Sequence, residues 1–112
     1  MGGALNAFCR NCGYRKDSMY VGGGMHSHHE LNLFPALDKE KSEVITENYF
    51  EKSELENEGV EFYDSEKLYD KENKTDVKIW EWMNTFLYRA KYYCPKCKKN
   101  ALEFFNALIF WD

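Results

Sequence analysis

All four cysteines of the chain lie in two C-x-x-C pairs, one near each end. The first pair is Cys9 and Cys12, followed directly by Gly13, and the second pair is Cys94 and Cys97. Each such segment can curl around a cation so that both sulfurs face it, and two of them complete a tetrahedron. The turn usually needs a left-handed backbone after the second cysteine, which glycine adopts without strain. The spacing therefore predicts that these four cysteines bind one metal ion.

Zinc is the expected metal, because it prefers tetrahedral sulfur in closed structural sites. A closed site leaves no position for water or substrate, so we expect one structural Zn²⁺ and no hydrolytic centre. Iron held by the same four thiolates would transfer single electrons, and it is the minority alternative. Structural disulfides are a further alternative. The first residues lack a secretory signal, which favours reduced thiols in a cytoplasmic protein.

Charge divides the chain into two parts. Residues 38–76 hold 14 acidic and 6 basic residues, a balance of −8, whereas the remainder holds 5 acidic and 9 basic residues. The net charge of −4 therefore hides a weakly basic metal-binding part and a strongly acidic middle. No apolar run reaches the ~20 residues that span a bilayer, so no membrane partner is expected.

The segments beside the cysteines are expected to be strands, over residues 4–9, 14–21, 87–93 and 101–111. Residues 42–56 form the best helix candidate, because Ser42 can act as an N-cap and apolar residues recur near one face. Residues 60–76 are expected to form a charged, solvent-facing excursion. Residues 77–86 fit either a helical stripe or an aromatic-rich strand.

The expected fold class is therefore α+β, mainly β. We expect a single zinc-ribbon domain over residues 1–112, with a rubredoxin-like double knuckle. The ribbon would consist of residues 4–25 and 87–111. A long acidic, partly helical insertion over residues 38–76 would decorate it.

Both cysteine segments resemble the knuckles of rubredoxins, in Cys9-x-x-Cys12-Gly13-Tyr14 and in Tyr93-Cys94-Pro95-x-Cys97. Two features depart from that family: the 81 residues from Gly13 to Tyr93, and Lys98 where a glycine is usual. Among the residues after the second knuckle, Asn100 is expected to take the left-handed position instead.

The chain is also similar to a group of small bacterial zinc-ribbon proteins with no assigned activity. They combine an N-terminal C-x-x-C-G-Y with a Gly-x-Gly-Met-like segment, here Gly22-Gly23-Gly24-Met25. They close with Tyr-x-Cys-Pro-x-Cys and an aromatic strand, here residues 92–110. The similarity implies a zinc-ribbon fold and carries no activity over.

The aromatic residues near the C-terminus favour a binding or adaptor protein. If strands alternate there, both faces are apolar, with Phe104 and Leu108 on one face and Phe105 and Ile109 on the other. A sheet that is apolar on both sides must be covered, so we expect contact with another protein or with a second copy of the chain.

Nucleic-acid binding is the alternative interpretation. Six basic residues flank the cysteine pairs: Arg10, Arg15, Lys16, Lys96, Lys98 and Lys99. With exposed aromatic rings they can hold phosphate and stack bases. The acidic middle would repel a polyanion unless it points away, and lysines at the knuckles also offset the negative charge of a zinc tetrathiolate.

Enzymatic activity is not expected. The sequence shows no nucleophile–base pair, no paired carboxylates at motif spacing and no phosphate loop, and it indicates no small-molecule substrate. His26, His28 and His29 form a histidine cluster whose expected role is a polar loop after the glycines. A second metal site with Glu30 is the alternative, although consecutive positions rarely converge on one ion.

Overall fold

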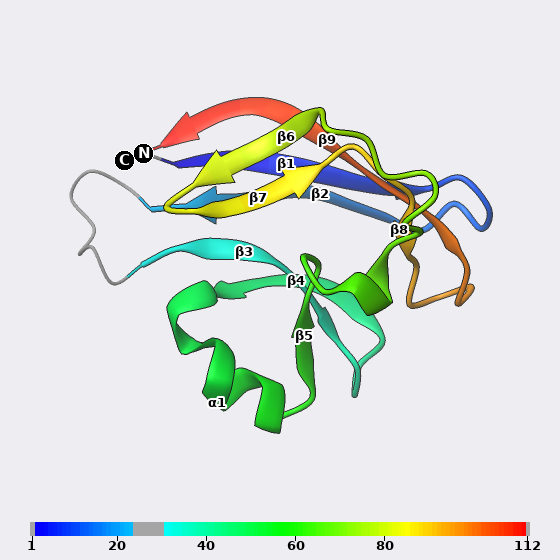
Figure 1. Ribbon diagram of the computed structural model, residues 1–112, viewed down its shortest axis with the longest axis horizontal. Coiled ribbons are helices and arrows are strands. Elements are labelled where there is room, and N and C mark those ends of the chain that lie inside the picture. The colour runs from blue at the N-terminus through cyan, green and yellow to red at the C-terminus, as the bar shows by residue number, and fades with distance from the viewer. Residues whose placement is uncertain (1, 24–30, 112) are drawn as a thin grey trace.

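The computed structural model describes residues 2–23 and 31–111, which form mainly strands (Figure 1). The strands are β1 (Gly2–Cys9), β2 (Arg15–Gly22), β3 (Leu33–Asp38), β4 (Glu43–Asn48), β5 (Val60–Phe62), β6 (Lys78–Trp82), β7 (Thr85–Tyr88), β8 (Tyr92–Tyr93) and β9 (Asn100–Trp111). The helical elements are the 3-10 turns η1 (Tyr49–Glu51) and η2 (Glu66–Leu68) and the α-helix α1 (Lys52–Asn57).

An antiparallel sheet in the order β4-β3-β2-β1-β9-β8 curls into a half-barrel, and β5 pairs with part of β3. At the centre, β1 pairs with β2 on one side and with β9 on the other. The first and last strands are therefore neighbours, with Gly2 opposite Trp111 and Cys9 opposite Leu102. The strands predicted over residues 4–9, 14–21 and 101–111 are confirmed, whereas residues 87–93 divide between β7 and β8.

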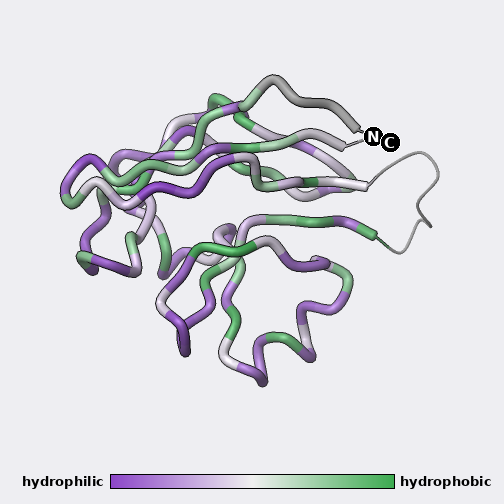
Figure 2. Tube along the Cα trace, turned by 180° about the vertical axis from the view of Figure 1, so that it is seen from behind, coloured by the Kyte–Doolittle hydropathy of each residue, from purple (hydrophilic) through white to green (hydrophobic). Residues whose placement is uncertain are grey.

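The inner face of the half-barrel holds the core. Every second side chain is buried from Leu5 to Cys9 in β1, from Met19 to Val21 in β2 and from Leu102 to Phe105 in β9, and Figure 2 shows hydrophobic and hydrophilic segments interspersed along the chain. The inward side chains are Leu5 and Ala7 of β1, Met19 and Val21 of β2, and Leu102 and Phe104 of β9. A separate two-stranded hairpin, β6–β7, adds Trp80 and Leu87 to the same core.

The ambiguous segment of residues 77–86 lies in this hairpin and is not a helix. Met83 and Asn84 connect β6 to β7, and both have positive φ angles, of 48° and 62°. Two consecutive left-handed residues form the turn whose twist matches that of the flanking strands. The aromatic residues of the segment therefore alternate across a strand pair, with Trp80 buried and Phe86 half-buried.

The expected zinc ribbon with a long acidic, partly helical insertion is wrong. In the described residues the only α-helix has six residues, and residues 38–76 belong to the sheet and its core. Strands β4 and β5 pair with β3, while Phe62, Tyr63 and Leu68 are buried. The apolar residues spaced among the acids supply this burial, which a count of charges does not reveal.

The helix predicted over residues 42–56 is replaced by β4, η1 and α1. Val44, Ile45 and Thr46 are β-branched and favour a strand, and β4 pairs with β3 along its whole length. Ser42 does not cap a helix. It has a φ of 53° and closes the β3–β4 turn, in which Asp38 accepts hydrogen bonds from the next backbone N–H groups.

The glycine segment after β2 allows a close approach of two backbones. A Cβ atom on Gly23 would lie 2.5 Å from the carbonyl oxygen of Leu31, so a larger residue would force the backbone to move. Residues 24–30, which contain the histidine cluster, lie outside the described residues. The polar loop expected there, and the alternative second metal site, stay predictions.

Alkaline pH is expected to destabilise the fold through two buried tyrosines. Burial raises the pKa of Tyr63 and Tyr92 well above the ordinary value of 10.0. Above that pH the unfolded chain releases these protons while the folded chain keeps them, so each tyrosine lowers stability by about 1.4 kcal/mol per pH unit. Denaturant unfolding at increasing pH should show this decline, and tyrosinate absorbance should rise in two phases. Full ionisation of the tyrosines without unfolding would contradict the expectation.

Candidate metal centre

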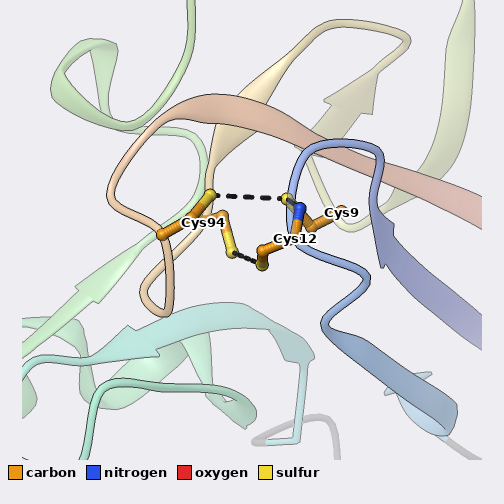
Figure 3. Close-up of side chains that lie close together, drawn as sticks. Cys9, Cys12 and Cys94 are labelled. Carbon is orange, nitrogen blue, oxygen red and sulfur yellow. Dashed lines mark hydrogen bonds between the residues drawn. The ribbon is translucent and has the colours of Figure 1, made fainter.

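Two turns at one end of the half-barrel carry the four cysteines (Figure 3). Cys9 and Cys12 lie at the turn between β1 and β2, and Cys94 and Cys97 lie between β8 and β9. Since β1 and β9 are neighbours, their pairing brings the two turns together, and the N–H of Arg10 donates to the carbonyl of Ala101 at 2.9 Å. Residues far apart in the sequence thus meet because the sheet places its first and last strands side by side.

The geometry of the sulfurs fits a tetrahedral metal ion. All four Sγ atoms lie within 4.8 Å of one another, and all four cysteines are free of disulfides. The Sγ atoms of Cys9 and Cys97 are 3.6 Å apart, and those of Cys12 and Cys94 are 3.7 Å apart. A tetrahedron with metal–sulfur bonds of 2.3 Å has edges of about 3.8 Å. The four predicted residues are therefore placed where they can hold one metal ion, whose identity this geometry leaves open.

The same two backbone hydrogen bonds close both turns. In each turn the first cysteine donates its N–H to the carbonyl five residues later and accepts from the N–H four residues later. The distances are 2.8 and 3.0 Å for Cys9 with Tyr14 and Gly13, and 2.9 and 2.8 Å for Cys94 with Lys99 and Lys98. The two halves of the site are therefore equivalent in backbone structure, although their sequences differ.

Backbone N–H groups also point at the sulfurs. The Sγ atom of Cys9 accepts from the N–H of Asn11 at 3.4 Å and of Cys12 at 3.5 Å. In the second turn, the N–H groups of the two residues at the same offsets donate to Cys94. Such donors stabilise negative charge on sulfur, so both turns are built to hold a thiolate.

One side of the centre is buried and the other reaches the surface. Cys9 and Cys94, the first cysteine of each turn, are buried, whereas Cys97 is half-buried and Cys12 is exposed. Burial raises the pKa of the Cys94 thiol, while a hydrogen bond from the Asn11 side chain lowers the pKa of Cys97. In both turns, therefore, the first cysteine is more buried than the second.

The left-handed residue that follows each cysteine pair is Gly13 in the first turn and Lys98 in the second. Their φ angles are 81° and 62°. Asn100, which the sequence suggested for this role, is instead the first residue of β9. The chain therefore adopts a conformation at Lys98 that costs a non-glycine residue about 1–2 kcal/mol.

Gly13→Ala and Lys98→Gly should change the stability of the protein in opposite directions. A Cβ on Gly13 would meet no atom within 4 Å, so Gly13→Ala is expected to cost only the conformational term, about 1 kcal/mol. Lys98→Gly is expected to raise stability by up to about 1 kcal/mol, because it removes the same strain. Thermal unfolding of the metal-loaded variants measures both effects. A destabilised Lys98→Gly protein would contradict the equivalence of the two turns.

Two tyrosines that the sequence analysis did not single out connect the centre to the rest of the fold. The hydroxyl of Tyr14 accepts a hydrogen bond from the N–H of Val44 at 3.0 Å, which joins the first turn to β4. The hydroxyl of Tyr63 donates to the carbonyl of Tyr93 at 2.8 Å, directly before Cys94. Tyr14 stands in the knuckle motif itself, whereas nothing in the local sequence around Tyr63 signals its role.

Comparisons with protein-family models, with curated proteins and with solved structures found no match to the chain. Across the described residues, no helix has the length and apolar character that crossing a membrane requires. Function is therefore argued from the site and the surface of the protein itself.

Proposed function

We propose that the protein is a non-catalytic binding protein whose four cysteines hold one structural zinc ion. The observation that carries the metal assignment is the packing of the four Sγ atoms within 4.8 Å, with two contacts close to the edge of a zinc–sulfur tetrahedron. The ion would fasten the β1–β2 turn to the β8–β9 turn, and so fix the ends of the three central strands.

A structural role follows from the ligand set. Four thiolates fill the coordination sphere of zinc, and they leave no open position at which a substrate or a water molecule could be activated. The N–H donors on the buried sulfurs support a permanently charged site. Metal affinity of this kind becomes folding free energy, because the site does not exist in the unfolded chain.

Elemental analysis of the purified protein, together with its visible spectrum, tests the metal assignment. We expect one zinc per chain and a colourless solution. A red protein with one iron per chain would instead support a single-electron carrier, for which the exposed sulfur of Cys12 offers a route to the surface. A metal-free protein that is fully folded would refute both forms of the proposal.

The binding role rests on the surface. Along β9 the expected alternation holds from Leu102 to Phe105, with Phe104 buried and Phe105 37% exposed, and it stops at Asn106, which is also exposed. The side chains of Leu108 and Ile109 lie outside the part of β9 whose side chains the structure describes. Contact with a protein or a second copy stays a prediction, and the exposed face of β9 is the place to look for a partner.

A further inference from the structure

The outer face of β1, β2 and β9 carries exposed aromatic rings. Phe8 and Phe105 lie on the side of the sheet opposite to the buried Ala7 and Phe104. Tyr20 of β2, 52% exposed, pairs with Ala4 and by strand alternation lies on the same face as Phe8. We call Phe8, Tyr20 and Phe105, with the neighbouring Asn6, Arg10 and Arg15, the outer aromatic face.

Two arginines are held in place on this face. The guanidinium of Arg10 lies 6.0 Å from the ring centre of Phe8 and 5.8 Å from that of Phe105. Its Nε donates to Glu103, and the Nε of Arg15 donates to Asp17. Among the described residues these carboxylates engage only the Nε of each arginine. The Nη groups therefore stay available for phosphate, and the carboxylates orient them.

Two grooves border Phe105. The first, about 340 Å³, is lined by Asn6, Ala7, Phe8, Arg15, Asp17 and Phe105. The second, about 270 Å³, lies between β9 and β6 and is lined by Arg10, Ile79, Arg89, Ala90, Glu103, Phe104 and Phe105. Each groove thus combines an aromatic wall with an arginine, and the two grooves share Phe105.

Basic and aromatic side chains also lie next to one another at the β6–β7 hairpin. Lys78 lies 4.6 Å from the ring centre of Phe86, and Lys74 lies 3.9 Å from that of Tyr88. The two rings stack on each other at 6.2 Å. Cations and ring faces therefore also meet on the hairpin, as they do where proteins hold a nucleic-acid strand, and Lys78 also pairs with Glu81 at 3.5 Å.

The part of the acidic middle around Tyr63 lies on the other side of the sheet from this face. Tyr63 packs against Phe104, with ring centres 5.2 Å apart, on the inner side of β9, whereas Phe105 projects from the opposite side of the same strand. In Figure 1, β4, β5 and α1 lie beyond β3, away from β1 and β9. Residues 70–76 instead run beside the second groove, where the N–H of Thr75 donates to the carbonyl of Arg89 at 3.0 Å. The repulsion that opposed nucleic-acid binding at the level of sequence is thereby reduced for the first part of the acidic middle only.

We propose that the outer aromatic face binds single-stranded nucleic acid, with bases stacked on Phe8 and Phe105 and phosphates held by Arg10 and Arg15. A base can stack on an exposed ring of the sheet only if it is not already stacked on its neighbours, and the bases of a duplex are. The proposal deepens the binding role proposed above, but it does not depend on which metal the cysteines hold.

Fluorescence anisotropy with a labelled oligothymidylate and oligouridylate of about ten nucleotides tests the proposal. The metal-loaded protein should bind both probes at low salt and bind the matching duplex more weakly. Phe105→Ala should weaken binding at least about fivefold. Arg15→Gln should weaken binding and lower the slope of log affinity against log salt by about one.

Phe50→Ala is the matched control, because Phe50 is 48% exposed but belongs to η1 in the acidic middle. It should leave the affinity unchanged. Metal content and circular dichroism of each variant separate a lost contact from a lost fold. Absence of binding to either probe at low salt, by a protein with its full metal content, would overturn the proposal and leave this face to a protein partner. Equal binding by the wild type and Phe105→Ala would overturn it too.

Discussion

Replacing Cys94 by serine is expected to release the metal ion and unfold the protein. Cys94 is fully buried, and its Sγ atom lies 3.7 Å from that of Cys12. The free energy of binding a structural zinc ion is about 10–16 kcal/mol, whereas the net stability of a domain is about 5–15 kcal/mol. Loss of the site therefore leaves little or no stability. Metal analysis and circular dichroism of Cys94→Ser should show both losses together.

Cys12→Ser separates the loss of a metal ligand from the cost of placing a hydroxyl group in the core. Cys12 supplies the same kind of ligand but is exposed, so its replacement weakens the metal site without placing a hydroxyl in the core. We expect Cys12→Ser to lose metal affinity and to retain more structure than Cys94→Ser when zinc is in excess. A well-folded, metal-free Cys94→Ser protein would show that the cysteines do not hold the fold together.

Truncation of Tyr63 to alanine is expected to have the second-largest effect. Its ring is fully buried, and it packs edge-on against Tyr92 and Phe104 with centroids 5.8 and 5.2 Å away. Removal of a buried aromatic side chain costs about 3–5 kcal/mol. Chemical denaturation of metal-loaded Tyr63→Ala measures this loss, and it tests whether the acidic middle is part of the core.

Tyr63→Phe measures the contribution of the Tyr63 hydroxyl group to stability. It keeps the packing but leaves the carbonyl of Tyr93 without its donor, for an expected cost of about 1–3 kcal/mol. Tyr20→Ala is the matched control, because this tyrosine is 52% exposed and its truncation should change stability by much less. If Tyr63→Ala were as stable as Tyr20→Ala, residues 38–76 would be an appendage, as the sequence had suggested.

The four candidate metal-binding residues could be located from the sequence because the geometry of each cysteine pair is local. Two residues between paired cysteines, with glycine at the left-handed position, define a knuckle whatever lies elsewhere. The strands beside the knuckles were predictable for a related reason, since a closed knuckle returns the chain antiparallel to itself. The left-handed conformation of Lys98 was not predictable, because the closed turn between β8 and β9 imposes a conformation that this residue type disfavours.

The middle of the chain could not be predicted because its pairing is long-range. The apolar residues within 42–56 recur near one face of a helix, yet β3 offers residues 43–48 a complete set of partners from Leu33 to Asp38. That pairing, together with β-branched residues, outweighs weak helix propensity. The role of Tyr63 likewise depends on Phe104, 41 positions later in the sequence, which no local pattern reveals.

X-ray absorption at the metal edge of the purified protein tests the central claim most directly. We expect a single shell of four sulfur atoms at about 2.3 Å from the metal, supplied by Cys9, Cys12, Cys94 and Cys97. A first shell that contains nitrogen or oxygen, such as a histidine from residues 24–30, or fewer than four sulfurs would contradict it.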